Sequence, residues 1–262
     1  MTVTWLFDFS DTTFSMLNPP SGVGMESAYE LAVSRLFGQG SLSTYRACFG
    51  LRDRAASEVV SRLTPESSPA EIRRLTKRLV EEKLSHLLDQ VGVTRNGAMW
   101  PTPSKGFLPF WHRLSELREA GAVETAVISA GGHAAFIERV WQVYDLRLPD
   151  VIISADDIPT VFRSKDMKSF SMPRPLPLAL ARQRLAQLNN SVGMNAWSNK
   201  GNVVYCGDNL MRDGGVAAKG AVRHGLFAPD QEIKFIPNGF QFPDWAWVQT
   251  HLPGIPGFLL VS

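Results

Sequence analysis

Five acidic or hydroxyl-bearing residues follow the first apolar run of the chain. The run is Val3–Phe7, and directly after it come Asp8, Ser10, Asp11, Thr12 and Thr13. A short apolar run of this kind suits a strand that is buried on both faces of a parallel sheet. A carboxylate at the end of such a strand lies at the carboxyl edge, where open α/β sheets bind ligands. The alternative is a turn in which these side chains only hydrogen-bond to the nearby backbone.

Two later predicted strands end in similar groups. Ser129 ends the run 124–129, and Asp208 follows the run 201–206, with Asp213 a little further on. Asp8 and Asp208 both end predicted central strands, so we expect them to meet at one edge of the sheet. Two carboxylates in such a position repel each other unless a cation joins them, and a hard divalent ion such as Mg²⁺ suits oxygen ligands. The alternatives are a helix N-cap at Ser129 and a plain acidic turn at Asp208.

These strings resemble the motifs of the haloacid dehalogenase superfamily. The first motif of that superfamily is a hydrophobic strand followed by Asp-x-Asp-x-Thr, and residues 8–12 here read DFSDT. The second motif is a strand that ends in Ser or Thr, which Ser129 matches. The fourth motif has the form Gly-Asp-x-x-x-x-Asp, which residues 207–213 match. The resemblance extends from the N-terminus to about Pro229.

The resemblance implies a role for each matching residue. Asp8 is expected to be the nucleophile, and Ser129 is expected to hydrogen-bond the transferring phosphoryl group. Asp8, the carbonyl oxygen of Ser10 and Asp208 are expected to bind Mg²⁺. Asp213 is expected to orient waters or a nearby lysine around the metal site.

A basic residue is expected to neutralise the nucleophile and the phosphate. In the superfamily this third motif is a Lys or Arg that opens the helix before the fourth strand, often as Lys-Pro-x-Pro. Arg174 matches by position, since residues 174–177 read RPLP, whereas Lys168 matches by chemistry and Lys165 lies just before it. The sequence leaves the choice open, and a basic residue in this region is otherwise a surface charge.

Ser10 departs from the superfamily pattern. In the phosphatases of the superfamily, the aspartate two residues after the nucleophile protonates the leaving oxygen and then activates water, which is worth about 10²–10⁴-fold. A serine hydroxyl has a far higher pKa than a carboxylic acid and performs this step poorly. Three interpretations of Ser10 follow. The substrate has a good leaving group, or the phospho-enzyme is long-lived. In the third, the chemistry is dehalogenation or carbon–phosphorus cleavage. Replacement by Asp11 is disfavoured, because a shift of one residue changes the direction of the side chain.

The elements that must position these residues alternate between strand and helix. This alternation predicts an α/β fold with right-handed crossovers and a parallel sheet, which the resemblance refines to a Rossmann-like three-layer core. Residues 18–98 show only helical patterns, including a helix that begins at Ser68-Pro69. The resemblance implies a helical cap at 18–98 and a core domain formed by 1–17 and 99–262. The predicted strands are 3–7, 124–129, 150–154, 201–206 and 225–228, and the predicted core helices are 107–120, 134–144, 176–188 and 216–222.

Composition excludes several classes of protein. The net charge of +2 over 262 residues is too small to indicate nucleic-acid or membrane binding. Cys48 and Cys206 do not make a disulfide framework, so a reduced, cytoplasmic protein is expected, and Cys206 is expected to be buried. His133 is expected to be a polar residue at a helix start that could face the site. Trp245 and Trp247 are expected to pack against the core.

The predicted function is a Mg²⁺-dependent phosphatase that acts on a small phosphorylated metabolite through an aspartyl-phosphate at Asp8. One alternative is a dehalogenase or phosphonate-cleaving hydrolase that uses the same residue. Another is a catalytically weak protein that binds a ligand or partner through the cap. The expected partner is a small-molecule substrate, and the sequence does not predict the oligomeric state.

Overall fold

The structure is a computed structural model that describes residues 2–24, 27–49, 56–129, 132–154, 156–157, 176–188, 202–210, 213–229 and 239–251. The chain divides into two compact units. One unit contains the described residues of Met1–Ser15, Thr102–Ile158 and Phe170–Ser262, and the other contains those of Met16–Pro101.

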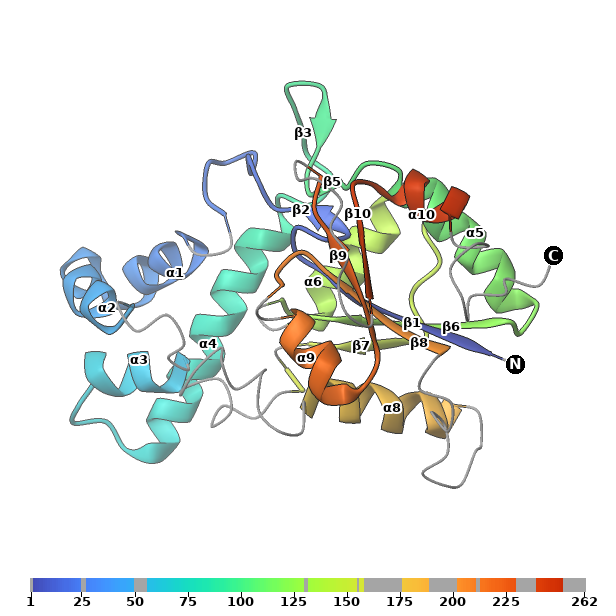
Figure 1. Cartoon of the computed structure of the whole chain (residues 1–262). Helices are drawn as coiled ribbons and strands as arrows, with labels where there is room; N and C mark the ends of the chain where they lie inside the picture. Colours follow the sequence, from blue (N-terminus) through green and yellow to red (C-terminus); the bar gives the residue numbers. More distant parts are fainter. Residues whose placement is uncertain are drawn as a thin grey trace. The chain divides into compact units, whose positions relative to one another are not determined.

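A parallel sheet forms the centre of the first unit (Figure 1). Over the described residues it has six strands in the order β10-β9-β8-β1-β6-β7. Strand β1 lies inside the sheet and pairs in parallel with β6 and with β8. The predicted α/β fold with a parallel sheet is therefore confirmed, whereas β10 was not predicted. The strands are β1 Val3–Asp8, β6 Val123–Ile128, β7 Val151–Ile153, β8 Val203–Gly207, β9 Arg223–Phe227 and β10 Gly239–Phe242.

One face of the sheet is packed with aromatic side chains. Successive strand residues point to opposite faces, so Trp5 and Phe7 of β1 share this face. Phe7 contacts Trp111 on α5 (Phe107–Glu119) with ring centroids 5.5 Å apart, and Trp111 contacts Trp141 on α6 (Ala134–Val143) at 5.3 Å. Phe7 also contacts Trp245 on α10 (Trp245–His251) at 5.6 Å. Trp245 is fully buried, as predicted, and Trp247 is half-buried.

The opposite face of the sheet is aliphatic. Leu6, which lies between the two aromatic residues in β1, belongs to a buried cluster with Leu178 of α8 (Leu176–Leu188) and Val216 of α9 (Asp213–Gly220). The core unit therefore has three layers, with α5, α6 and α10 on one side of the sheet and α8 and α9 on the other (Figure 1). The three-layer architecture was predicted.

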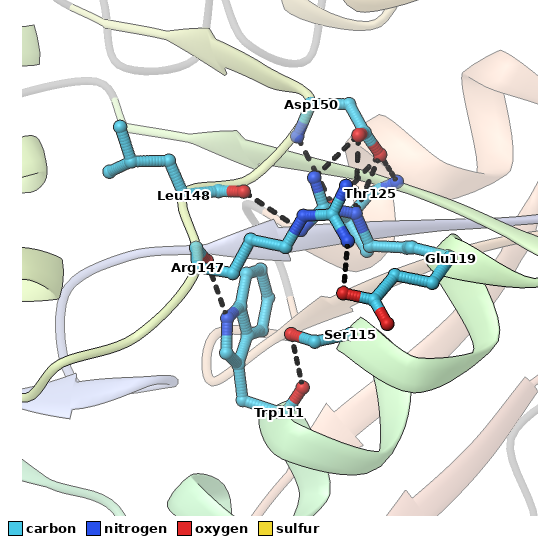
Figure 2. Close-up of polar contacts among 8 residues, drawn as sticks. Trp111, Ser115, Glu119, Thr125, Arg147, Leu148 and Asp150 are labelled. Carbon is cyan, nitrogen blue, oxygen red and sulfur yellow. Dashed lines mark hydrogen bonds and ion pairs between the residues drawn. The ribbon is translucent and has the colours of Figure 1, made fainter.

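A polar network fastens α5 to the amino ends of β6 and β7. Figure 2 shows Asp150, just before β7, beside Thr125 of β6. The Arg118 guanidinium on α5 donates to both carboxylate oxygens of Asp150, at 3.0 Å from Nε to Oδ2, and to the Leu148 carbonyl oxygen at 2.8 Å. Thr125 donates its backbone N–H to Asp150 Oδ2 at 2.8 Å, and the Trp111 indole donates to the Arg147 carbonyl oxygen at 2.8 Å. These contacts lie at the edge of the sheet away from Asp8.

The second unit is mainly helical. Helix α4 begins as predicted, because the Ser68 hydroxyl accepts a hydrogen bond from the Glu71 N–H at 3.2 Å and Pro69 is the first helical residue. The helices bury a common core that includes Val33, Val60 and Leu79. They are α1 Ser27–Phe37, η1 Gln39–Ser41, α2 Leu42–Phe49, α3 Ala56–Leu63 and α4 Pro69–Leu88.

The expectation that residues 18–98 contain only helix is wrong for the last residues of this segment. Strands β3 (Thr94–Arg95) and β4 (Ala98–Met99) form a short antiparallel hairpin. Asn96 and Gly97 connect them with φ values of 51° and 79°. This left-handed pair is the arrangement that an Asn-Gly turn favours in a two-residue hairpin, so local turn chemistry explains the difference.

The chain leaves and re-enters the core unit through a second antiparallel pair, β2 (Phe14–Ser15) with β5 (Thr102–Pro103). Within the described residues, no helix has both the length and the apolar character needed to cross a membrane.

Candidate active site

The carboxyl ends of three adjacent strands bring the predicted site residues to one edge. Asp8, the last residue of β1, is in register with Ile128, the last residue of β6, so Ser129 follows at the same level. On the other side, Phe7 is in register with Cys206 of β8. Asp208 therefore comes one residue after the end of β8 and beside the end of β1. The prediction that Asp8 and Asp208 end central strands is confirmed.

A cluster of three carboxylates occupies this edge. Asp8, Asp208 and Asp213 each place one oxygen within 4.8 Å of the other two. Asp8 and Asp213 are 6% and 1% exposed, whereas Asp208 is exposed. Buried carboxylates this close repel one another strongly unless a cation compensates them. An all-oxygen donor set of this kind suits Mg²⁺, so the residues present fit the predicted metal.

Asp213 is held rigidly in the cluster. It begins α9, and its Oδ2 accepts a hydrogen bond from the Asn209 N–H at 2.9 Å while its Oδ1 lies 3.4 Å from the Tyr205 hydroxyl. A Cβ atom on Gly207 would overlap the Asp213 carboxylate. The glycine of the fourth motif therefore provides the space into which this carboxylate projects.

His224 of β9 lies near Asp213 and does not offset its charge. Burial lowers the pKa of His224 to about 4, although the negative charge of Asp213 acts in the opposite direction. The imidazole is therefore neutral at pH 7, and neither ring nitrogen has a hydrogen-bond partner among the described residues. His224 therefore adds no positive charge beside the three carboxylates.

The turn after β1 is fixed by its own hydrogen bonds. The Thr13 hydroxyl donates to the Phe9 carbonyl oxygen at 2.7 Å, and the buried Thr12 hydroxyl lies 3.4 Å from Asp208 Oδ1. Asp11 is exposed and has a φ of 62°, in the left-handed region. Ser10 is half-buried, and metal binding by its carbonyl oxygen stays a prediction.

Ser129 is buried where β6 ends. Its backbone N–H donates to the Ile153 carbonyl oxygen at 2.8 Å, and its Oγ accepts from the Gly132 N–H at 3.0 Å. A hydroxyl that accepts one hydrogen bond still has a proton to donate, which suits the predicted contact with a phosphoryl oxygen. The N-cap of α6 is His133, so Ser129 does not serve as the cap of that helix.

The third motif cannot be placed in the structure. Lys165, Lys168 and Arg174 all lie outside the described residues, so the choice among them stays a prediction. Cys206 is fully buried in β8, as predicted, and burial raises the pKa of its thiol well above the usual value. This thiol is therefore a poor candidate for a nucleophile.

Comparison with known proteins identifies the fold. No protein-family model matches the sequence, and no curated protein matches it. Among the solved structures that match, two each cover 97% of this chain and 99% of their own length. They are the 2-haloacid dehalogenase from Pseudomonas syringae pv. Tomato DC3000, with a TM-score of 0.56 at 15% identity, and the HAD phosphatase from Thermococcus onnurineus, with a TM-score of 0.53 at 16% identity.

The chain has the haloacid dehalogenase fold. The resemblance drawn from the motifs is confirmed at the level of the fold. Because the identities are this low, the similarity shows the fold and not the chemistry.

One prominent contact in this haloacid dehalogenase fold was not predicted from the sequence. His133 is the N-cap of α6, as its position suggested, but its side chain makes no capping hydrogen bond. Instead, Nδ1 lies 2.7 Å from Oδ1 of Asp156, which follows β7. The two residues are far apart along the chain, so only the pairing of β6 with β7 brings them together.

Proposed function

We propose that the chain is a Mg²⁺-dependent hydrolase that removes phosphate from a small phosphorylated metabolite. The observation that supports this proposal is the cluster of Asp8, Asp208 and Asp213 at the sheet edge where Ser129 follows β6. A phosphate dianion cannot approach three carboxylates unless positive charge lies between them. The arrangement therefore suits a substrate that binds together with a divalent cation.

The chemical step belongs to Asp8. One Asp8 carboxylate oxygen attacks phosphorus while the bond from phosphorus to the leaving oxygen breaks, giving an aspartyl-phosphate. Water then attacks the same phosphorus, the bond to Asp8 breaks, and inorganic phosphate leaves. Ser129 donates a hydrogen bond to a phosphoryl oxygen. Mg²⁺, when held by Asp8, the Ser10 carbonyl oxygen and Asp208, would offset the charge of the nucleophile and the phosphate.

We propose that the helical segment 18–98 is a cap that closes over the substrate, and that 1–17 and 99–262 form the catalytic domain. A cap that closes over a bound substrate excludes water and completes the binding site. This role limits the substrate to a small molecule. The identity of that molecule depends on the cap residues that contact it.

Ser10 favours one second candidate, which is dehalogenation. Halide leaves without a proton, so a carboxylate can displace it from carbon although the nearby acid is absent. Asp8 would then form an ester to carbon as the halide departs, and water would cleave that ester. The acidic cluster argues against this candidate, because a haloacid substrate is itself an anion and gains nothing from three carboxylates.

The test is a release assay with the full-length protein and Mg²⁺. Phosphate release from a panel of phosphomonoesters and halide release from 2-haloacids are followed for the wild type, Asp8→Asn and Asp145→Asn. Asp145 is an exposed acid just after the far end of α6, so its variant controls for the loss of one charge. We expect phosphate release that Asp8→Asn abolishes and Asp145→Asn leaves unchanged. Halide release alone would establish the second candidate, and release of neither product would indicate a binding protein.

A further inference from the structure

The proposed phosphatase lacks an acid at the position where one is expected. An alkoxide is a poor leaving group, so its departure needs a proton, and water needs a base before it attacks the phospho-enzyme. Ser10 cannot supply either function near neutral pH. The question is whether another described side chain at this edge of the sheet is suited to both steps.

His133 lies on the segment that follows the end of β6. Ser129 follows the last residue of β6, beside the end of β1, where Asp8 is the last strand residue. The Gly132 N–H donates to Ser129 Oγ, and a Cβ on Gly132 would lie only 2.8 Å from that oxygen. The N–H groups of Phe136 and Ile137 then donate to the His133 carbonyl oxygen, each at 3.1 Å. These hydrogen bonds fix the His133 backbone at the start of α6, the helix that follows β6, and β6 pairs with the strand that ends in Asp8.

The imidazole is held by a carboxylate. His133 Nδ1 lies 2.7 Å from Asp156 Oδ1, and the His133 side chain is only 5% exposed, whereas that of Asp156 is 51% exposed. The other Asp156 oxygen, Oδ2, accepts from the Ala134 N–H at 3.0 Å and from the Ser154 hydroxyl at 3.2 Å. Burial alone would raise the pKa of Asp156, but the hydrogen bonds from His133 and Ala134 outweigh it and lower the pKa.

This arrangement fixes the roles of the two ring nitrogens. Asp156 is ionised near neutral pH, so it accepts a hydrogen bond and Nδ1 carries the donor proton. Nε2 lies on the far side of the ring from Asp156 and is the nitrogen that gains or loses a proton. A carboxylate that orients an imidazole and stabilises the imidazolium is a recurrent device of general acid–base catalysis.

A purely structural role explains the pair less well. The first N–H of α6, that of Ala134, is already bonded to Asp156, so the imidazole is not needed to cap the helix. A serine or asparagine at this position would cap the helix better than histidine. The other charged groups beside this pair are Asp157 and Arg184, which form an ion pair with each other.

We propose that His133, oriented by Asp156, supplies the acid and base function that Ser10 cannot, and this inference rests on the phosphatase function proposed above. As the phosphorus–oxygen bond breaks, the imidazolium gives its Nε2 proton to the leaving oxygen. The neutral Nε2 then takes a proton from the water that attacks the Asp8 phosphoryl group, and the bond from phosphorus to Asp8 breaks. The imidazolium is regenerated, so the cycle balances.

The test compares two esters in the full-length protein with Mg²⁺. An alkyl phosphate needs a proton on its leaving oxygen, whereas an aryl phosphate with an electron-withdrawing ring does not. We expect His133→Asn to lower kcat/KM for the alkyl ester by about 10²–10⁴-fold and for the aryl ester by less than about tenfold. His112→Asn, a change at an exposed histidine on α5, should alter neither value.

Two further measurements separate catalysis from structure. Added imidazole should restore part of the alkyl phosphatase activity of His133→Ala. Asp156→Asn should shift the alkaline limb of the kcat/KM profile to lower pH, because the imidazolium loses its anionic partner. Equal losses for both esters without rescue by imidazole, or no loss in His133→Asn, would overturn the assignment of His133. In those cases activity that depends on Asp8 leaves the proposed function standing, whereas a wild type that hydrolyses neither ester overturns both.

Discussion

At the scale of single residues, the candidate site depends on one glycine. Gly207 ends β8, and the Asp213 carboxylate fills the space where a Cβ would lie. The same carboxylate is fixed by the Asn209 N–H and lies beside the Tyr205 hydroxyl. Several contacts therefore determine how close the third acid comes to Asp8. We infer that Gly207 is required because of this close approach.

Gly207→Ala tests that inference. The added methyl group must displace the Asp213 carboxylate, so we expect the Kd for Mg²⁺ to rise by about 10–100-fold, the range seen when groups that support a metal site are altered. Isothermal titration with MgCl₂ measures the change. Gly40→Ala is the matched control, since a Cβ at Gly40 meets nothing within 4 Å. An unchanged Kd in Gly207→Ala would show that the position of Asp213 does not matter for the metal.

The sequence predicted some of these residues and not others. Asp8, Ser129 and Asp208 could be placed at one edge because each comes at the end of an apolar run that had to be a strand. The pairing of His133 with Asp156 could not be placed, because it depends on the register of β7 against β6 and on the turn after β7. No local pattern in the sequence encodes either of these features.

At the scale of elements, α5 is fastened to the sheet at the edge opposite the candidate site. Its Arg118 side chain is 5% exposed and binds both oxygens of Asp150. Asp150 also accepts a hydrogen bond from the Thr125 N–H (Figure 2). Phe107, Phe110 and Trp111 of the same helix pack against the aromatic face of β1. The helix therefore holds the strand that carries Asp8.

Arg118→Met should destabilise the fold. It leaves Asp150 without its main cationic partner, which costs about 3–5 kcal/mol in a fully buried pair. The Asp150 side chain is 27% exposed and partly solvated, so we expect a loss of about 2–3 kcal/mol. Urea unfolding measures it. Arg113→Met on the same helix removes an exposed pair with Glu116 and should cost less than about 0.5 kcal/mol. Equal effects of the two substitutions would contradict a special role for Arg118.

Elements with a strong local pattern were predicted, and those without one were not. Helix α8 was predicted with its observed bounds, and α1 and α4 follow the predicted apolar stripes. Strand β10 was missed because four residues are too few for a clear pattern, and pairing with β9 defines it as a strand. Helix α10 supports the site from this same end of the chain, since Trp245 Nε1 donates to the Thr12 carbonyl oxygen at 3.1 Å.

At the scale of the whole molecule, the candidate site residues lie at one edge of one sheet. The residues that follow β6 and β8 meet Asp8 of the first strand there, although each is more than a hundred residues away from Asp8 in sequence. The central strands could be predicted because apolar runs recur between helical patterns. Under the function proposed above, the first strand supplies the attacking group of a covalent phosphoryl enzyme.

The most direct test of this account is to trap that covalent species. The full-length protein is mixed with an aryl phosphate and Mg²⁺, quenched in acid within milliseconds, and digested for mass spectrometry. The account predicts a peptide that carries one phosphoryl group on Asp8, formed in a burst that matches the enzyme concentration and absent from Asp8→Asn. Steady phosphate release with no phosphoryl group on any peptide, or with the group on a residue other than Asp8, would contradict the account.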